Sequence, residues 1–170
     1  MANVLDIDEA VFQLTVNRAV QVVFKTMIGK AAKPVPHFAD PSVYSVALDQ
    51  DHVVGTAGMV GAINGLIYLY LELSFAKLCA GRLLGLSPRE INRSGDDVVN
   101  DAVGELTNMT IGTLKNQLAD RGFPCRLTIP SILRGREFTI TPIKSAVRHI
   151  YRFDIDGHGV TADLLVQSGH

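Results

Sequence analysis

Residues 8–28 carry apolar side chains at most positions, with the spacing of an α-helix. Only a thin strip of this segment is polar, and it consists of Gln13, Asn17 and Gln21. A helix that is apolar on almost all sides is typical of a buried helix, because no wide polar face is left for water. The pattern therefore predicts a buried N-terminal helix that ends at Gly29, followed by an extended connection over the proline-containing residues 33–36.

Strand-like segments follow this helix, and three of them are candidates: 43–48, 53–60 and 66–71. Asn64 and Gly65 lie between the last two segments, and this pair predicts a tight hairpin turn. Residues 53–71 contain no charged residue. Their glycines and the hairpin signal nevertheless favour two buried strands over a membrane span.

The second half of the chain begins with two more helices. The pattern predicts them at 74–84 and 96–121, separated by an acidic, turn-rich connector at 87–95. A strand at 125–129 then runs into Pro130, which cannot donate a backbone hydrogen bond and is typical of a strand end.

The C-terminal part predicts a turn at the Arg-Gly pair 134–135 and then a hairpin. Its strands are 144–154 and 160–166, joined by the turn-forming residues 156–159. The element order predicts an α+β fold in which an antiparallel sheet carries long α-helices on one face. The length of 170 residues suits one domain spanning 1–170.

The helix at 96–121 carries the most informative pattern in the chain. Asp101, Glu105, Asn108 and Gly112 are spaced four, three and four residues apart, so they fall on one stripe of the helix. A mainly apolar set of residues falls on the opposite side: Val99, Ala102, Val103, Leu106, Thr110 and Leu114. The polar stripe is therefore predicted to face solvent, where a carboxylate beside a carboxamide can grip a charged partner and orient a water.

Charge and composition exclude several kinds of function. The net charge is −1, only 19% of residues are charged and no polybasic run occurs, so nothing indicates nucleic-acid binding. Asp6, Asp8 and Glu9 stand where a secretion signal would need basic and apolar residues, so we predict a cytoplasmic protein without membrane insertion. High apolarity with low charge also suits a protein that buries surface against another subunit.

Cysteine and histidine patterns predict no further chemistry. Cys79 and Cys125 are too few for a disulfide scaffold, so we predict two reduced, buried thiols. The five histidines have neither ligand spacing nor a cysteine neighbour, and no metal site is predicted. The glycines at 55, 58 and 61 lie in predicted strands and open no helix, so we interpret them as sheet packing rather than a phosphate loop.

The motif helix resembles a known family. Asp101-x3-Glu105-x2-Asn108, followed after twenty-one residues by Pro130, resembles the signature of the CheC/CheX/FliY chemotaxis phosphatases, with CheX as the best match. The segment 104–112 also fits the helix of that branch. CheC-type relatives carry a second Glu-x-x-Asn site on the N-terminal helix, but here Leu14 stands three residues before Asn17. One site per chain is therefore expected.

The resemblance implies a phosphatase that removes the phosphoryl group from an aspartyl-phosphorylated CheY-like response regulator. It implies that Asn108 positions a water for in-line attack and that Glu105 accepts a hydrogen bond from the lysine of the regulator. Asp101, Gly112 and Pro130 would support these residues or contact the partner. The protein would need no cofactor of its own, because Mg²⁺ is expected on the regulator. A homodimer is also implied.

Other interpretations stay open at this point. Glu and Asn on an amphipathic helix can form an ordinary solvated face, and Pro130 can simply end a strand. Relatives on the same fold serve as flagellar-switch parts, so the chain can also be a docking module that binds a regulator without catalysis. An apolar subunit used only for assembly is a third hypothesis. The pathway can be chemotaxis or another two-component system.

Overall fold

The computed structural model describes residues 9–36, 45–141 and 144–168, which contain four helices and a seven-stranded antiparallel sheet. The helices are α1 (Glu9–Ile28), α2 (Leu73–Leu84), α3 (Pro88–Arg93) and α4 (Asp96–Asp120). The strands are β1 (Ala32–Val35), β2 (Ser45–Gly61), β3 (Ile63–Glu72), β4 (Cys125–Leu127), β5 (Ser131–Thr139), β6 (Val147–Ile155) and β7 (His158–Ser168). Their order in the sheet is β1-β6-β7-β3-β2-β4, and β5 pairs with β2 outside that path.

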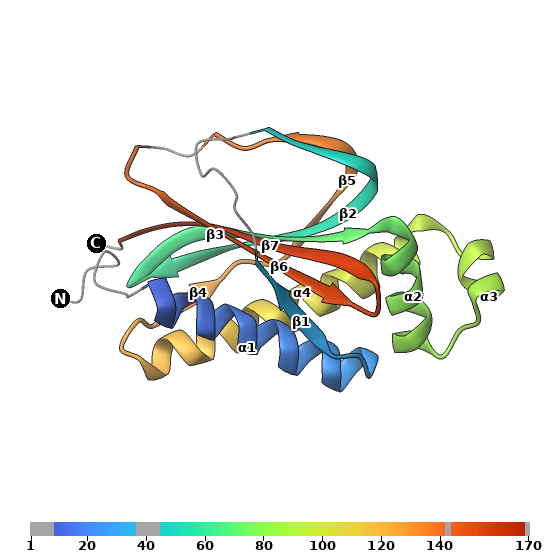
Figure 1. Cartoon of the computed structure of the whole chain (residues 1–170), viewed down its shortest axis with the longest axis horizontal. Helices are drawn as coiled ribbons and strands as arrows, with labels where there is room; N and C mark the ends of the chain where they lie inside the picture. The colour runs from blue at the N-terminus through green and yellow to red at the C-terminus, as the bar shows by residue number, and fades with distance from the viewer. Residues whose placement is uncertain (1–8, 37–44, 142–143, 169–170) are drawn as a thin grey trace.

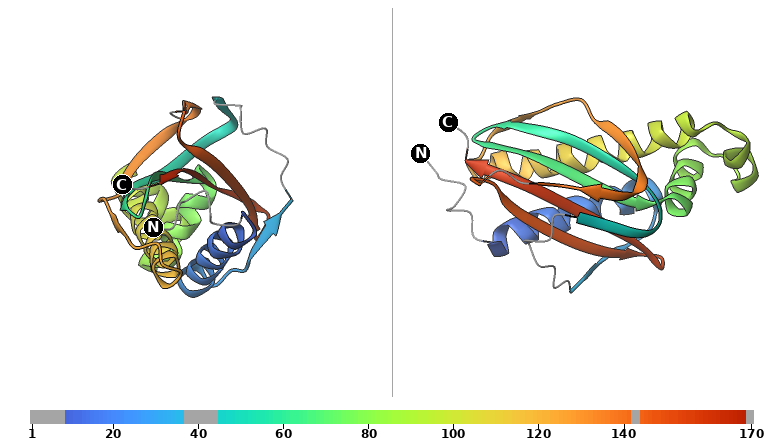
Figure 2. Two further views of the ribbon diagram at one scale, coloured as in Figure 1. Left: turned by 90° about the vertical axis from the view of Figure 1, so that its left-hand side faces the viewer. Right: turned by 90° about the horizontal axis from the view of Figure 1, so that it is seen from above.

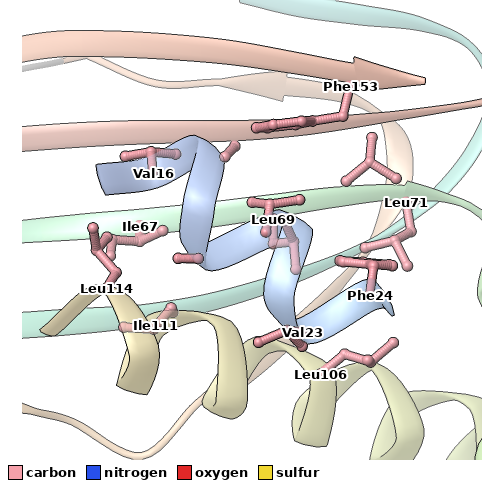
Figure 3. Packing of buried hydrophobic residues seen from close by; sticks show 14 of the residues in the cluster. Val16, Val23, Phe24, Ile67, Leu69, Leu71, Leu106, Ile111, Leu114 and Phe153 are labelled. Atoms are coloured by element: carbon pink, nitrogen blue, oxygen red, sulfur yellow. The ribbon is translucent and has the colours of Figure 1, made fainter. Parts of the chain in front are cut away.

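The long helices α1 and α4 lie side by side under one face of the sheet (Figures 1 and 2), as the α+β prediction requires. Their apolar sides meet the inner side of the strands in one continuous core, of which Figure 3 shows a part. Phe24 of α1, Leu106 of α4 and Leu71 of β3 are fully buried there. Each such side chain stabilises the fold by about 1.5–3 kcal/mol, so α4 is held firmly against the sheet.

The prediction that α1 is buried on all sides is wrong. Its inner residues reach the core, but Val11, Leu14 and Val22 expose 38%, 64% and 47% of their surface. The physical reason is that α1 packs its inner side against α4 and strands β1 and β6, and the described chain places nothing over its outer side. These three apolar side chains therefore face solvent on the outer side of α1.

The hairpin between the predicted strands 53–60 and 66–71 turns earlier than expected. β2 ends at Gly61 and β3 begins at Ile63, so Asn64 and Gly65 lie inside β3. The Asn64 side chain still serves the turn, because its Oδ1 accepts a hydrogen bond from the Gly61 amide at 3.0 Å. Gly65 is needed for another reason: a Cβ there would lie 2.3 Å from the carbonyl oxygen of Leu165 in β7.

Two segments predicted as turns belong to regular elements. Residues 134–135 lie inside β5, opposite a register shift in β2 between Ala47 and His52. Gly135 therefore lies at an irregularity of the strand pairing, and the chain does not reverse its direction there. β2 itself runs on from residue 45 and includes the described part of the separate strand predicted at 43–48, whose first two residues lie outside the described ranges.

The connector at 87–95 contains the short helix α3, which starts with a capping box. The Ser87 amide donates to Glu90 Oε2 at 2.7 Å, and the Glu90 amide donates to Ser87 Oγ at 3.3 Å. The segment is also not acidic, because Arg89 and Arg93 outnumber Glu90. Ser87 followed by Pro88 was thus a helix start rather than a turn.

Other predictions are confirmed. The C-terminal hairpin turns at Asp156 and Gly157, which both have positive φ, of 55° and 82°. Positive φ at both positions is typical of the tight turn that an Asp-Gly pair forms. Cys79 and Cys125 are free and buried. Burial raises the pKa of the Cys79 thiol to about 12 and also raises the pKa of Cys125, so neither is a reactive thiolate near neutral pH.

The segment at 33–36, predicted as a plain connection, forms an edge of the sheet instead. Most of it belongs to β1, which pairs antiparallel with β6, and Pro34 lies opposite Phe153. Proline is tolerated in an edge strand because one side of that strand needs no hydrogen-bond donor.

Candidate functional site

Helix α4 presents the polar stripe that its sequence indicates. The helix begins after Gly95, and Asp96 and Asp97 occupy its first turn, where negative charge favours the positive end of the helix dipole. Its buried side consists of nine residues, seven of which belong to the hydrophobic core. Asp101, Glu105 and Asn108 are exposed on the opposite side. One rigid element therefore holds all three at fixed spacing.

Beside this stripe the surface is hollowed into an open depression of about 590 Å³. One wall is the polar face of α4, and the other is the segment from β4 into β5. The depression is lined by Asn100, Asp101, Gly104, Glu105, Asn108, Leu127, Thr128, Ile129, Pro130 and Ile132. Four of the five predicted site residues thus share one hollow, whose lining contains two carboxylates and no cation.

Gly112, the fifth predicted residue, does not line the depression. It lies one turn beyond Asn108 on α4, and a Cβ built there would meet nothing within 4 Å. Gly104, inside the depression, is similar: its nearest neighbour would be the Ile132 side chain at 3.9 Å. A helix-interior glycine costs about 1 kcal/mol relative to alanine. Among the described residues, no packing contact explains either glycine.

The loop between β4 and β5 is fixed by two hydrogen bonds to β2. The Thr128 amide donates to the Gly58 carbonyl at 2.9 Å, and the Gly58 amide donates to Thr128 Oγ1 at 2.7 Å. This anchorage presents the next two residues, Ile129 and Pro130, at the rim of the depression. Ile129 exposes 90% of its surface, more than the other large apolar side chains in the described chain.

Sequence reasoning placed Pro130 in the site through the family signature, but it missed Ile129. A local signal for the backbone existed, because the residue before a proline is restricted to an extended conformation. The pattern alone gave no reason to expect that the side chain would face solvent.

Arg134 of β5 connects the sheet to α4 beside the depression. Its Nε donates to Asn100 Oδ1 at 2.7 Å, and Nη1 lies 3.3 Å from the Asp96 carboxylate. A further bond runs from Nη2 to the Asp96 carbonyl at 3.3 Å. Because Asn100 itself lines the depression, this arginine fixes the first turns of α4 relative to the opposite wall.

Replacing Arg134 by alanine should lower the free energy of unfolding by about 1 kcal/mol, because charge-assisted hydrogen bonds to Asn100 and Asp96 are lost. Urea denaturation measures this change. Arg136→Ala is the matched control, since its bond to Asp51 joins two mostly exposed side chains. Equal losses in the two variants would contradict the anchoring role of Arg134.

Next to Asn108, on the buried side of α4, the helix approaches the sheet very closely at Gly55 of β2. A Cβ built on Gly55 of β2 would stand 1.8 Å from Thr107 Oγ1 and 2.7 Å from Thr107 Cβ. Thr107 is fully buried, and its hydroxyl donates to the Val103 carbonyl at 2.7 Å. The missing side chain of Gly55 thus lets α4 lie directly on β2, as the packing interpretation of that glycine predicts.

Across the residues that the structure describes, His, Cys, Asp and Glu side chains nowhere form a group of three that could bind a metal ion. No helix within 9–36, 45–141 or 144–168 has the length and hydrophobicity of a membrane span.

Comparison with known proteins gives consistent matches. The family model "Chemotaxis phosphatase CheX" matches residues 53–154, which include α4 and the loop before β5. The CheY-P phosphatase CheX of Thermotoga maritima is 29% identical over 106 residues, which cover 62% of this chain and 66% of that protein. The matched part therefore spans just under two thirds of the relative.

Solved structures share the fold. A chemotaxis protein CheX from Desulfovibrio desulfuricans superposes with a TM-score of 0.77 at 22% identity, covering 92% of this chain and 99% of that chain. CheX from Borrelia burgdorferi, crystallised in a CheX–CheY–BeF3–Mg²⁺ complex, has a TM-score of 0.61 at 16% identity, covering 92% of this chain and 98% of that chain. At these sequence identities, the structural similarity shows a shared fold.

Proposed function

The chain belongs to the CheX family of chemotaxis phosphatases, and from that premise we propose that it dephosphorylates an aspartyl-phosphorylated, CheY-like response regulator. The observation that carries this proposal is the arrangement of Glu105 and Asn108, exposed on a rigid helix at the edge of an acidic hollow. A hollow formed partly by an exposed apolar loop suits a protein surface as substrate better than a small molecule. The relative from Thermotoga maritima, named as a CheY-P phosphatase, supports the same reaction.

In the proposed mechanism the regulator itself supplies most of the groups that activate its phosphoryl group. The phosphoryl group sits on an aspartate of the regulator, where Mg²⁺ and a lysine of the regulator neutralise its charge. A water attacks phosphorus in line, the bond to the aspartyl oxygen breaks, and inorganic phosphate and free carboxylate result. The phosphatase therefore needs mainly to place that water and to hold the two proteins in register.

Asn108 is the proposed water-positioning residue. Its amide oxygen can accept a hydrogen bond from the water while its amino group donates to a phosphoryl oxygen. Glu105, one turn earlier and exposed, can accept a hydrogen bond from the lysine of the regulator. Asp101 adds a second negative charge to the same hollow. In this proposal the amide of Asn108 positions the water, and the two carboxylates contact the regulator.

Ile129 and Pro130 supply the proposed apolar contact with the regulator. Ile129→Ser should raise KM for the phosphorylated regulator about tenfold with kcat unchanged, because burying such a side chain contributes about 1–2 kcal/mol to binding. Steady-state phosphate release at several regulator concentrations measures both constants. Leu84→Ser, which changes an exposed leucine of α2 away from the depression, is the control and should leave KM unchanged.

Gly112 is proposed to leave clearance for the docked regulator. Gly112→Ala should raise the free energy of unfolding by about 1 kcal/mol, because alanine favours a helix and the added Cβ meets open space. The same variant should lower kcat/KM at least about tenfold, because overpacking an interface costs about 1–3 kcal/mol. Denaturation and phosphate-release assays give the two values. A stabilised variant with full activity would remove Gly112 from the contact surface.

A non-catalytic docking module on the same fold is the alternative function. The test of the main proposal is the lifetime of a phosphorylated CheY-like regulator, purified with Mg²⁺, in the presence and absence of the protein. Catalysis shortens that lifetime at substoichiometric protein. Phosphorylation-dependent capture of the regulator without any shortening would favour docking instead.

We also propose that two copies associate, as the family resemblance implies. The outer side of α1, where Val11, Leu14 and Val22 are exposed, provides a surface for such association. Multi-angle light scattering of the wild type and of Leu14→Asp tests both the stoichiometry and the surface.

A further inference from the structure

A second hollow, separate from the depression beside α4, opens between α2, α3 and the strands β2 and β5. Its volume is about 840 Å³, and it shares no lining residue with the depression. Small-molecule sites usually measure roughly 300–1,000 Å³. Figure 2 shows α3 standing beyond the end of the sheet, and the hollow lies where this short helix turns back toward α2. Neither the proposed reaction nor the family signature uses this place.

Apolar side chains line much of the hollow, and its walls are firmly held. Leu73, Leu78, Leu86 and Ile91 contribute from α2, from α3 and from the turn between them. Ile91 is 2% exposed and fixes α3 to the core, while the capping box at Ser87 fixes the start of that helix. Leu78 in contrast exposes 38% of its surface. The hollow is therefore preformed and presents apolar surface to solvent.

The charged side chains around the hollow leave a positive excess. Asp51 and Arg136 neutralise each other, with Oδ1 and Nε 2.7 Å apart. Lys77 Nζ donates a hydrogen bond to a neutral group, Asn92 Oδ1, at 3.3 Å. Neither Lys77 nor Arg82 forms an ion pair within the described part of the chain.

Arg82 acts at longer range on Asp156, whose pKa is lowered mainly by Lys30. Lys30 Nζ lies 3.0 Å from that carboxylate and is its direct partner. Arg82 therefore keeps its charge available to a ligand in the hollow. Two cations beside an apolar lining form a surface complementary to an anion that carries an apolar body.

We propose that this hollow binds a small anionic molecule with an apolar body, of the class of aromatic or branched carboxylates. The carboxylate lies near Lys77 and Arg82, and the apolar body covers Leu78 and Leu86. A small molecule fits better than a protein segment because the volume of the hollow is that of a small-molecule site and its lining comes from α2, α3, β2 and β5. The site is independent of the proposed phosphatase function, so either can fail alone.

The test uses two probes of the same shape, 2-naphthoate and its neutral amide, 2-naphthamide, titrated into the ¹⁵N-labelled full chain and followed by NMR. We expect saturable shifts at the amides that line the hollow and a Kd about fivefold lower for the carboxylate. Lys77→Ala and Arg82→Ala should each reduce this preference. Arg93→Ala, which removes an exposed arginine of α3 outside the hollow, should preserve it.

Ser74→Trp provides a second test, because it adds bulk to an exposed residue that lines the hollow. This variant should lose binding of 2-naphthoate while keeping its thermal stability and its activity toward a phosphorylated regulator. Equal affinity for the two probes, or shifts that never saturate, would overturn the proposal. Shifts of the same amides with protein concentration alone would also overturn it, since a second copy of the chain would then occupy the hollow.

Discussion

Replacing Asn108 by alanine is expected to slow phosphate release from a phosphorylated regulator about 100-fold while leaving regulator binding intact. Removing one positioned hydrogen-bonding group from a preorganised site typically lowers kcat by about 10²–10³-fold. Asn108 is exposed, so its removal leaves no buried cavity and the fold should be unaffected. Single-turnover decay of the phosphorylated regulator at saturating protein measures the chemical step directly.

The control for this variant lies on the same helix. Asn116 is also an exposed asparagine of α4, two turns further on and outside the depression. With Asn116→Ala, the phosphorylated regulator should therefore decay at the wild-type rate. Both variants should unfold at the same urea concentration. A wild-type rate in Asn108→Ala would exclude the water-positioning role, whereas loss of binding in that variant would assign the residue to docking.

Replacing Gly55 by alanine is expected to have the largest effect on stability. The new Cβ would overlap Thr107 Oγ1 at 1.8 Å, and α4 cannot move away from the sheet without opening the core that its buried side forms. Overpacking of this kind costs about 1–3 kcal/mol and sometimes more, and we expect at least the upper value. The melting temperature Tm should fall by about 6–12 °C for a domain of this size.

The double variant Gly55→Ala/Thr107→Ala tests the cause. Removing Oγ1 and Cγ2 of Thr107 relieves the two contacts at 1.8 and 2.8 Å and leaves only the contact of Cβ at 2.7 Å. Part of the lost stability should therefore return, although Thr107→Ala alone destabilises by emptying a packed site. If the stability losses of the two single variants simply add in the double variant, the overlap with Thr107 is not the reason why Gly55→Ala is destabilised. Activity should follow the same order, because Thr107 precedes Asn108 and sets where α4 lies on the sheet.

The parts of the site that the sequence predicted depend on local periodicity. Asp101, Glu105 and Asn108 share a face because helix geometry requires it, whatever surrounds the helix. The residues that sequence reasoning missed depend on contacts between distant segments. Arg134 reaches Asn100 across 34 positions, and the loop that carries Ile129 is held to Gly58 across 70. No spacing rule within one element contains that information.

The fold class followed from the order of helices and strands, but several details required tertiary contacts. Asn64 and Gly65 carry the strongest hairpin signal in their segment, yet the turn forms earlier, and Gly65 lies inside β3 where β7 leaves no room for a Cβ. Likewise, the apolar pattern of α1 indicated burial on all sides. Burial also depends on how many neighbours a helix finds, and here one side of α1 has none among the described residues.

The short edge strand β1 has a consequence for how copies of this chain can meet. Lys33 and Pro34 are both exposed in this strand, and a proline offers no N–H to an incoming strand while a lysine resists dehydration. Addition of a strand from a second copy at the β1 edge is therefore disfavoured, so this edge should not extend the sheet between molecules at high concentration.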